Sequence, residues 1–462
     1  MYRPSRKRCL VILPTLAIIN GLLWSFYQAA YSQGDPLSTH KLQTHRRIGY
    51  QHEKDTPIGL DLIGLKGIKR RTDKTLFETK TASVFSIKST KVVSQVTSEP
   101  LPQPMRMSDS DQTVAEKYLG TFDTAPRFSI IGSPGTSDNL PQSTSPEGMH
   151  LAIAMCGNRI EEVKVLVKSV MLFTRHATIH VFSDPPSQKP LCEHIKSLPG
   201  EYRKQFTYHI YNITLPRGKD AETWSKLYGP CAAQRLFIPY ILQRVNKLIY
   251  VDTDVIFLSP MEKLWGQFSR FNKSHIAALI PEHRDPSFGW YNRVANIPYY
   301  GKLGLNSGVM LMDLVRLRED QWLDKMMNYF KKYLSKLILG DQDLINIFFH
   351  FEPEKLYKCS CEWNYRADHC QFPSTRSRCP PALKDGAYTL HGNSQRFHGP
   401  KYPALSAVYT AFQSHRLGLD TKTALLESIK TRLKDARSSC ARMPEAFYKQ
   451  IEVHINTPSV PH

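Results

Sequence analysis

The sequence predicts an α/β domain in which strands and amphipathic helices alternate around one sheet. Short apolar runs of strand length recur from His150 onward, segments with the apolar spacing of helices separate them, and acidic or polar residues directly follow several runs. Ligands of open α/β sheets bind beyond the carboxyl ends of the strands. The residues that end each run are therefore the first candidates for a functional site.

The first half of the pattern leads to an acidic triplet. In chain order we expect strands at 151–156, 178–182, 205–213 and 247–251, with helices at 160–171 and 232–245. Cys156 and Gly157, which close the first strand, are candidate binding residues. The run Lys247 to Val251 ends directly at Asp252-Thr253-Asp254.

The second half repeats the alternation and ends at a histidine. In chain order we expect a helix at 264–271, strands at 276–280 and 306–312, a helix at about 320–337, an apolar helix at 344–349 and a strand at 387–390. His391 directly follows the last of these strands. We place the whole domain at residues 148–440.

Asp252 and Asp254 are candidate ligands of a divalent cation. On an extended backbone, carboxylates two residues apart point to the same side, so both can reach one hard cation that keeps free positions for phosphate oxygens. Such a site suits a nucleotide-sugar diphosphate held through Mn²⁺ or Mg²⁺. A solvated turn is the alternative, because aspartates are common at strand ends and in turns.

His391 is the candidate third ligand. Two carboxylates and one imidazole, each at a strand end, occupy about half of an octahedral Mn²⁺ shell. A hydrogen-bonded structural histidine is the alternative. Nearby, His398 is a rival ligand, and Lys401 is a candidate to neutralise the β-phosphate of a donor.

A second acidic segment, Asp341-Gln342-Asp343, precedes the apolar helix at 344–349. Either aspartate can cap the helix, and a capped helix end is also a rigid mount for a catalytic side chain. Arg235, on the helix before Asp252, can bind a carboxylate or phosphate through two hydrogen bonds. The alternative for Arg235 is an ordinary surface arginine.

The chain before the domain is expected to anchor it to a membrane. A basic tail at 1–8 precedes an uncharged apolar stretch at 9–30, which matches the roughly 17 to 25 residues that span a bilayer. The basic flank predicts type II topology with a lumenal domain, whereas a cleaved signal peptide is the alternative. Residues 31–147, rich in Ser, Thr, Lys, Gln and Pro, predict a flexible, disordered stem. We assign residues 441–462 to a C-terminal tail.

Eight of the nine cysteines follow the apolar stretch. In an oxidising lumen an even count predicts disulfides, although spacing cannot select among the 105 pairings. Cys359, Cys361, Cys370 and Cys379 could instead bind zinc, but their spacing lacks the usual paired knuckles.

Asn212 and Asn272 begin N-glycosylation sequons, which carry meaning in a lumenal chain. The formal net charge of +20 raises the question of nucleic acid. The basic residues are scattered and no RNA-binding signature is present, so we expect no nucleic-acid partner.

Four motifs, in order, resemble those of glycosyltransferase family 8. They are Leu248-Ile-Tyr-Val-Asp-Thr-Asp-Val, Leu305-Asn-Ser-Gly-Val-Met-Leu-Met-Asp, Gly340-Asp-Gln-Asp-Leu-Ile-Asn and Leu390-His-Gly-Asn. Further runs look like the glucoside xylosyltransferases of that family, among them Cys231-Ala-Ala-Gln-Arg-Leu-Phe-Ile-Pro, Gly289-Trp-Tyr-Asn-Arg and Trp363-Asn-Tyr-Arg-Ala-Asp-His-Cys. The resemblance covers about His150 to Phe412.

The resemblance implies a GT-A-type, Rossmann-like nucleotide-sugar-binding domain with a mixed central sheet. It implies a retaining enzyme that transfers α-xylose from UDP-xylose, with Mn²⁺ or alternatively Mg²⁺ holding the diphosphate. The acceptor would be glucose O-linked to EGF-like repeats, as in Notch-type receptors, and the linkage α1,3. Such an enzyme would reside in the ER or Golgi membrane.

Residue roles follow from the same resemblance. Asp252, Asp254 and His391 would hold the metal, and Arg235 would support the aspartates. Asn306 and Ser307 would contact donor sugar or acceptor, and Asp341 and Gln342 would lie near the anomeric carbon. Beside these roles, Cys156, Gly157 and Lys401 are candidates for donor or acceptor binding.

Several alternatives stay open. The family ending H-x-x-G-x-x-K-P-W is changed here, since His391 and Lys401 are ten residues apart and Tyr402-Pro403 comes next. Retention through a covalent intermediate would use Asp341 or Asp343, whereas same-face attack would use Gln342 to steady the sugar. Other candidate functions are a family 8 enzyme using UDP-glucose or UDP-galactose, and a non-catalytic, lectin-like protein of the secretory pathway.

Overall fold

The computed structural model describes residues 124–130, 148–216, 224, 231–371 and 374–457. All of them belong to one compact unit of the chain. The expected anchor lies outside the described residues, as does most of the expected stem. Among the helices that are described, none combines the length and apolar character needed to cross a membrane.

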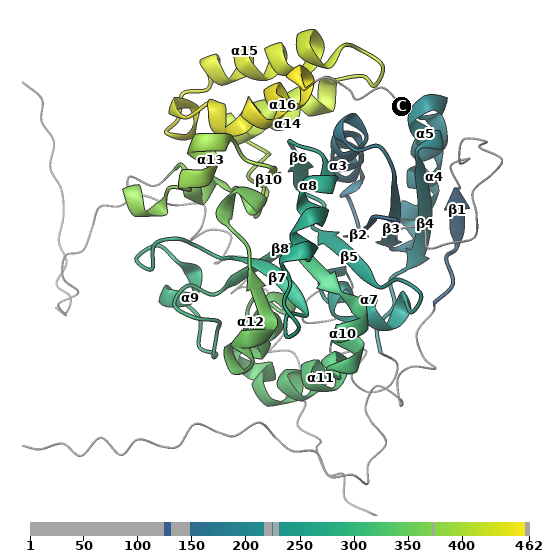
Figure 1. Cartoon of the computed structure of the whole chain (residues 1–462), viewed down its shortest axis with the longest axis vertical. Helices are drawn as coiled ribbons and strands as arrows, with labels where there is room; N and C mark the ends of the chain where they lie inside the picture. The colour runs from purple at the N-terminus through teal and green to yellow at the C-terminus, as the bar shows by residue number, and fades with distance from the viewer. Residues whose placement is uncertain (1–123, 131–147, 217–223, 225–230, 372–373, 458–462) are drawn as a thin grey trace, which may run out of the picture. The chain divides into compact units, whose positions relative to one another are not determined.

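An eight-stranded sheet forms the centre of this unit (Figure 1). Its strands, in spatial order, are β1 (Phe128–Ile130), β4 (Phe206–Asn212), β3 (Ala177–Ser183), β2 (His150–Met155), β5 (Lys247–Val251), β8 (Leu305–Asp313), β7 (Ala277–Pro281) and β9 (Leu356–Lys358). Strands β4, β3, β2 and β5 run parallel, whereas β8 is antiparallel to both β5 and β7. The predicted α/β fold with a mixed central sheet is therefore confirmed.

Helices cover both faces of the sheet. One face carries α3 (Ile160–Phe173), α4 (Pro185–Ser197), α5 (Gly200–Lys204) and α8 (Met261–Trp265), and α8 continues into the 3-10 turn Gly266–Arg270. On the other side are α7 (Gln234–Ile241), α10 (Leu314–Glu319), α11 (Trp322–Tyr333) and α12 (Asp341–Phe351), with the short α9 (Trp290–Arg293) beside α12. The sheet is thus the middle of three layers.

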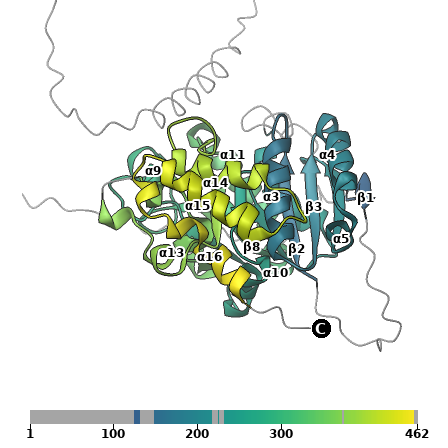
Figure 2. The same cartoon turned by 90° about the horizontal axis from the view of Figure 1, so that it is seen from above.

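A second sheet, with two strands, connects the acidic triplet to His391. Strand β6 (Val255–Phe257) directly follows the acidic triplet and pairs antiparallel with β10 (Thr389–His391). Around it are α13 (Pro380–Asp385), α14 (Pro403–Ser414), α15 (Glu427–Asp435) and α16 (Glu445–Asn456). Figures 1 and 2 both show the last three of these helices gathered together. They share one apolar cluster with Ile256 and Leu390.

Both ends of the compact part differ from the expected boundaries. Residues 441–462, expected as a tail, carry α16, and its Ala446, Phe447 and Ile451 are buried in the cluster around Leu390. Helix α16 stays in place because this apolar stripe packs on the domain. At the other end, β1 lies within the expected stem and pairs antiparallel with β4.

Two predicted helices are shorter than expected, and one is longer. The helix expected at 232–245 is α7, which stops at Ile241, and the one expected at 320–337 is α11, which ends at Tyr333 and continues as a 3-10 turn. The apolar helix expected at 344–349 begins earlier. Asp341 and Gln342 therefore lie in the first turn of α12 rather than before it.

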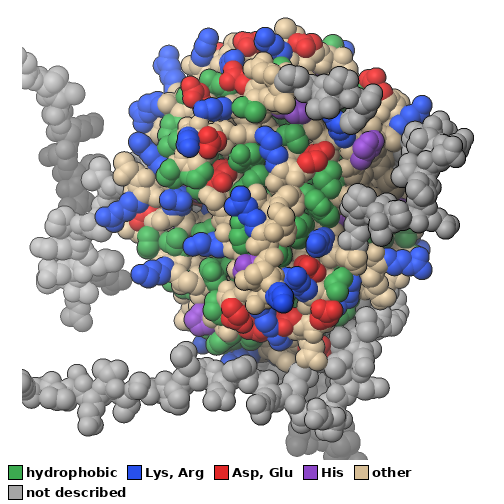
Figure 3. Space-filling view, in the orientation of Figure 1, with side chains coloured by type: hydrophobic (Ala, Val, Ile, Leu, Met, Phe, Trp, Pro, Cys, Tyr) green, Lys and Arg blue, Asp and Glu red, His purple; other side chains and the backbone are tan. Residues whose placement is uncertain are grey.

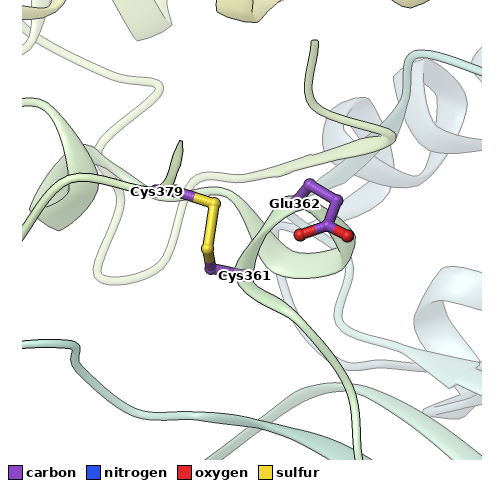
Figure 4. A group of neighbouring side chains, drawn as sticks. All are labelled: Cys361, Glu362 and Cys379. Carbon is purple, nitrogen blue, oxygen red and sulfur yellow. A yellow bond between two sulfur atoms is a disulfide. The ribbon is translucent and has the colours of Figure 1, made fainter. Parts of the chain in front are cut away.

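Three disulfides join Cys156 to Cys231, Cys361 to Cys379 and Cys370 to Cys440. Cys192 and Cys359 are buried thiols, so the even count of cysteines did not mean that all are paired. The zinc alternative is wrong, since two of its four ligands are bonded to each other. Figure 4 shows that bond with Glu362 beside it, and the bonded sulfurs leave no thiolate for a metal.

Charged residues are mixed on the surface. On the face drawn in Figure 3, Lys and Arg side chains are interspersed with Asp, Glu and apolar side chains. They form no single basic patch on this face, in keeping with the expectation that the positive charge is scattered.

Candidate active site

Asp252, Thr253 and Asp254 form the connection between β5 and β6. The chain turns here instead of staying extended as we expected, yet both carboxylates still face one point. The pairing of β6 with β10 explains this, because it sets His391 opposite Val255, the residue after Asp254. His391 Nε2 lies 3.3 Å from Asp254 Oδ1 and 3.8 Å from Asp252 Oδ2.

These three side chains fit a divalent cation. Each offers one ligand atom, and the three atoms lie within 4.8 Å of one another. Burial alone raises the pKa of Asp254, but the adjacent His391 ring and the guanidinium of Arg159 outweigh it, and the pKa lies below its ordinary value. A carboxylate held ionised beside an imidazole is the donor set that Mn²⁺ or Mg²⁺ accepts, with imidazole favouring manganese.

His391 is fixed by close packing on a glycine of β8. It is only 2% exposed, and its Nδ1 lies 2.9 Å from Asn364 Oδ1. A Cβ atom at Gly308 would come within 2.1 Å of His391 Cε1. Glycine is therefore required at position 308 for the ring to reach the two aspartates.

The structure brings His391, and not His398, to the aspartates. His398 Nε2 lies 2.9 Å from Glu162 Oε1 on α3. Lys401 is exposed in the loop after β10, with its ammonium 5.9 Å from the centre of the Tyr402 ring. Its place at a diphosphate stays a prediction.

Arg235 connects the aspartate turn to the start of α12. The helix α7 holds it 6% exposed, with its Nη2 donating to Asp252 Oδ1 at 2.9 Å and its Nη1 donating to the carbonyl oxygen of Ser307 at 2.5 Å. Its Nε lies 2.5 Å from Asp341 Oδ2, and the guanidinium stacks over Tyr250. The alternative of a surface arginine is wrong.

Asp341 and Gln342 both lie at this junction, and their place near the anomeric carbon of a donor stays a prediction. Burial raises the pKa of Asp341 to about 7, although Arg235 opposes the shift. The side-chain carbonyl of Gln342 accepts hydrogen bonds from the backbone N–H of Ser307 at 3.0 Å and from its hydroxyl at 3.3 Å. Ser307 thus fixes the position of the Gln342 side chain at this junction.

Asp343 has a structural role. Its Oδ2 accepts the backbone N–H groups of Ile338 and Leu339 at 2.7 and 2.8 Å, and its Oδ1 accepts the hydroxyl of Tyr291 at 3.0 Å. The carboxylate closes the loop that leads into α12. The expectation that an aspartate caps the first amides of the helix is wrong, because the N-cap residue is Gly340 and no side chain caps α12.

The other predicted binding residues lie along the same edge of the sheet. Asn306 is the second residue of β8, and its Oδ1 accepts from the N–H of Gly308 and from the side chain of Asn364. Cys156 is bonded to Cys231 at the end of β2, and Gly157 follows it with φ +63°, where its N–H donates to Asp184. Their contacts with a donor remain predictions.

Three residues near the metal ligands escaped the sequence reasoning. Arg159, just after β2, donates two hydrogen bonds to Glu162, which also accepts from Thr253. Asn364 touches His391. The available signals were the position of Arg159 after the first strand and the inclusion of Asn364 in a family-like motif, but neither indicates a contact partner.

The two sequons differ in exposure. Asn272 lies in an exposed turn, where its side-chain oxygen accepts the N–H groups of Ser274 and His275. Asn212 is half-buried at the end of β4, and Thr214 of its sequon is 8% exposed. Asn272 is therefore the more accessible of the two predicted glycosylation sites.

Comparisons with known proteins show what the chain is similar to. The model of a family described as Glycosyl transferase family 8 matches residues 150–378. Glucoside xylosyltransferase 2 of Mus musculus is 40% identical over 342 residues, which are 71% of this chain and 76% of that protein. Glucoside xylosyltransferase 1 of Homo sapiens is 40% identical over 318 residues, which are 66% and 71% of the two chains.

Among solved structures, mouse xyloside xylosyltransferase 1 in its apo form is similar over 53% of this chain and 97% of that chain. The two are 17% identical and the TM-score is 0.41. A score this low adds nothing to what the sequence relatives show.

Proposed function

We propose that this chain, which belongs to glycosyl transferase family 8 and is a glycosyltransferase, transfers xylose to a glucoside. The curated relatives at 40% identity support xylose as the sugar. In full, the proposal is transfer of α-xylose from UDP-xylose to O-linked glucose on EGF-like repeats, in an α1,3 linkage with retention. The family membership argues against a non-catalytic lectin-like protein.

One observation carries the chemistry: Asp252, Asp254 and His391 converge on one point, and Arg235 joins that point to Asp341. The set fits Mn²⁺, with Mg²⁺ as the alternative. When bound, the ion would supply Lewis-acid stabilisation of the charge that develops on the departing UDP.

The chain's own residues prepare this site in two ways. Arg235 holds Asp252 in place and neutralises part of the negative charge that Asp252 and Asp341 would otherwise concentrate there. Ser307 fixes the side-chain carbonyl of Gln342, which is half-exposed and so able to meet a sugar. A preorganised dipole of this kind stabilises a developing positive charge without reorganisation.

We infer that retention proceeds by same-face attack. Asp343 is 1% exposed and its oxygens accept three hydrogen bonds from the protein, so a substrate does not reach it. Asp341 is 4% exposed and ion-paired with Arg235, which weakens it as a nucleophile. Asp341→Asn is expected to retain measurable transfer, and loss of all transfer together with a trapped glycosyl-enzyme in the wild type would establish the covalent route instead.

The donor is tested with the full-length protein and three labelled donors: UDP-xylose, UDP-glucose and UDP-galactose. The acceptor is a folded EGF-like repeat that carries O-linked glucose, and the matched control is the same repeat without glucose. We expect xylose to be transferred to the glucosylated repeat alone. Faster transfer of glucose or galactose would overturn the choice of donor, and equal transfer to the bare repeat would overturn the acceptor.

We further propose that the enzyme is a single-pass type II protein of the ER or Golgi membrane. The basic tail at 1–8 and the apolar stretch at 9–30 support this, and the three disulfides fit an oxidising lumen. Modification of the exposed Asn272 is the corresponding test. Loss of a glycosidase-sensitive mass shift in Asn272→Gln is the expected result.

A further inference from the structure

A chain of hydrogen bonds runs from the backbone of β8 to the metal-site histidine. The N–H of Gly308 donates to Asn306 Oδ1 at 3.1 Å. A backbone N–H can only donate, so the atom that Asn306 presents to it must be the carboxamide oxygen. The orientation of the Asn306 side chain is therefore fixed by the main chain.

That orientation determines the next one. The same Asn306 oxygen lies 2.8 Å from the side-chain amide of Asn364, which must present its NH₂ group there. The opposite end of Asn364, its Oδ1, then faces His391 Nδ1 at 2.9 Å. An oxygen can only accept, so His391 carries its proton on Nδ1.

In the neutral ring, a proton on Nδ1 leaves Nε2 with a lone pair on the side of the aspartates, where Nε2 lies 3.3 Å from Asp254 Oδ1. All three members of the chain are buried: Asn306 is 5% exposed, Asn364 0% and His391 2%. Water therefore has little access to replace either amide. The opposite tautomer would place an N–H where a cation must bind.

We propose that Asn364, supported by Asn306, is a positioning residue that selects the tautomer of His391 in which Nε2 can bind the metal. The inference rests on the metal site of the proposed function and adds two residues to it. Partners that orient a ligating histidine typically change metal affinity by about 10 to 100-fold when they are removed. The same range is expected here.

The first test measures Mn²⁺ binding to the full-length protein with UDP present, by the electron paramagnetic resonance signal of free Mn²⁺. Asn364→Leu keeps the volume of the side chain but removes the acceptor, and a loss of affinity of about 10 to 100-fold is expected. Asn364→Asp keeps an acceptor facing Nδ1 but loses the donor to Asn306 Oδ1, so its loss of affinity is expected to be smaller than that of Asn364→Leu. Gln188→Leu, which removes a buried amide from α4, is the matched control and should leave affinity unchanged.

Wild-type affinity in Asn364→Leu would overturn the inference while leaving the proposed function intact. Absence of Mn²⁺ binding in the wild type would overturn both. The second test needs no variant at position 364, because ¹⁵N-histidine spectra of the wild type, assigned with His391→Gln, report the protonated ring nitrogen. In the neutral ring, protonation at Nδ1 is expected, and protonation at Nε2 would overturn the inference.

Discussion

The chain contains two Asp-x-Asp triplets at its site, and they behave differently. Asp252 and Asp254 lie in a turn between two strands, and both carboxylates face His391. Asp341 and Asp343 lie in the first turn of α12, where residues two apart are separated by about 200° around the helix axis. Their carboxylates diverge, because the backbone and not the sequence pattern decides what a pair of aspartates can bind.

Exposure separates the two triplets in the same way. The Asp252 side chain is 29% exposed, so it can meet a ligand from solution, whereas Asp343 is 1% exposed and is used by the protein itself. Arg235 links the triplets through Asp252 and Asp341. The difference teaches that one triplet is open to a ligand from solution, whereas the other mainly forms part of the protein around the site.

The largest effect is expected from removing both carboxylates of the first triplet. Asp252→Asn with Asp254→Asn keeps the shape of the turn but removes the charge that would hold a cation and its diphosphate. Transfer should fall by at least about 10³-fold, which corresponds to roughly 4 kcal/mol. The measurement is xylose transfer at saturating Mn²⁺, with circular dichroism to show that the fold is retained. Metal-stimulated transfer at the wild-type rate would show that the first triplet is not the ligand set.

The next effect concerns the link between the triplets. Arg235→Lys keeps the positive charge, but an ammonium cannot reach Asp252, Asp341 and the Ser307 carbonyl together as the planar guanidinium does. We expect kcat/KM to fall by about 10²-fold, or roughly 3 kcal/mol. The matched control is Arg318→Lys, in which a single hydrogen bond to the Pro239 carbonyl is at stake. Equal activity of the two variants would mean that the triplets act independently.

The second triplet should show its structural role in the pH dependence of stability. Burial raises the pKa of Asp343 to about 6, above the value near 3.9 of an exposed aspartate. The folded protein then binds this proton more tightly than the unfolded chain does. The contribution of this proton to the free energy of unfolding is complete below about pH 4 and is lost as the pH rises through about 6. It amounts to at most about 3 kcal/mol.

Asp343→Asn removes that titration while its amide can still accept from Ile338 and Leu339. The urea midpoint of the variant should therefore change less than that of the wild type between pH 4 and pH 7. Xylose transfer per folded molecule should stay within a few-fold. If the urea midpoint of Asp343→Asn depended on pH as the midpoint of the wild type does, the structural role of Asp343 would be wrong.

Local signals allowed much of this fold and site to be predicted from the sequence. The apolar run Lys247 to Val251 is β5, residue for residue. The strand expected at 387–390 is β10, which begins at Thr389 and includes His391 as its last residue. Both predictions depend only on a short-range apolar pattern and on the polar residue that ends it. The apolar stripe of α16 was also readable, but it was assigned to a tail.

The features that escaped prediction depend on contacts between distant segments. The pairing of β6 with β10 joins residues far apart in the chain, such as Val255 and His391, and is what sets His391 beside Asp254. Asn364 resembles any polar residue until its neighbours in space are known. Likewise, two Asp-x-Asp triplets could not be told apart by composition, because their roles depend on the turn and the helix that hold them.

The smallest effect is expected at the middle residue of the first triplet. The Thr253 hydroxyl donates to Glu162 Oε2 at 2.9 Å. Thr253→Val keeps the shape and removes this bond, while Glu162 keeps its contacts with Arg159 and His398. The expected cost is about 1 kcal/mol of stability, with transfer within about twofold of the wild type, and Thr253→Ser is the control that retains the hydroxyl. Unchanged thermal unfolding together with a loss of transfer as large as in the double aspartate variant would show that the geometry of the turn depends on this one hydrogen bond. The contrast between a ligand triplet and a structural triplet would then fail.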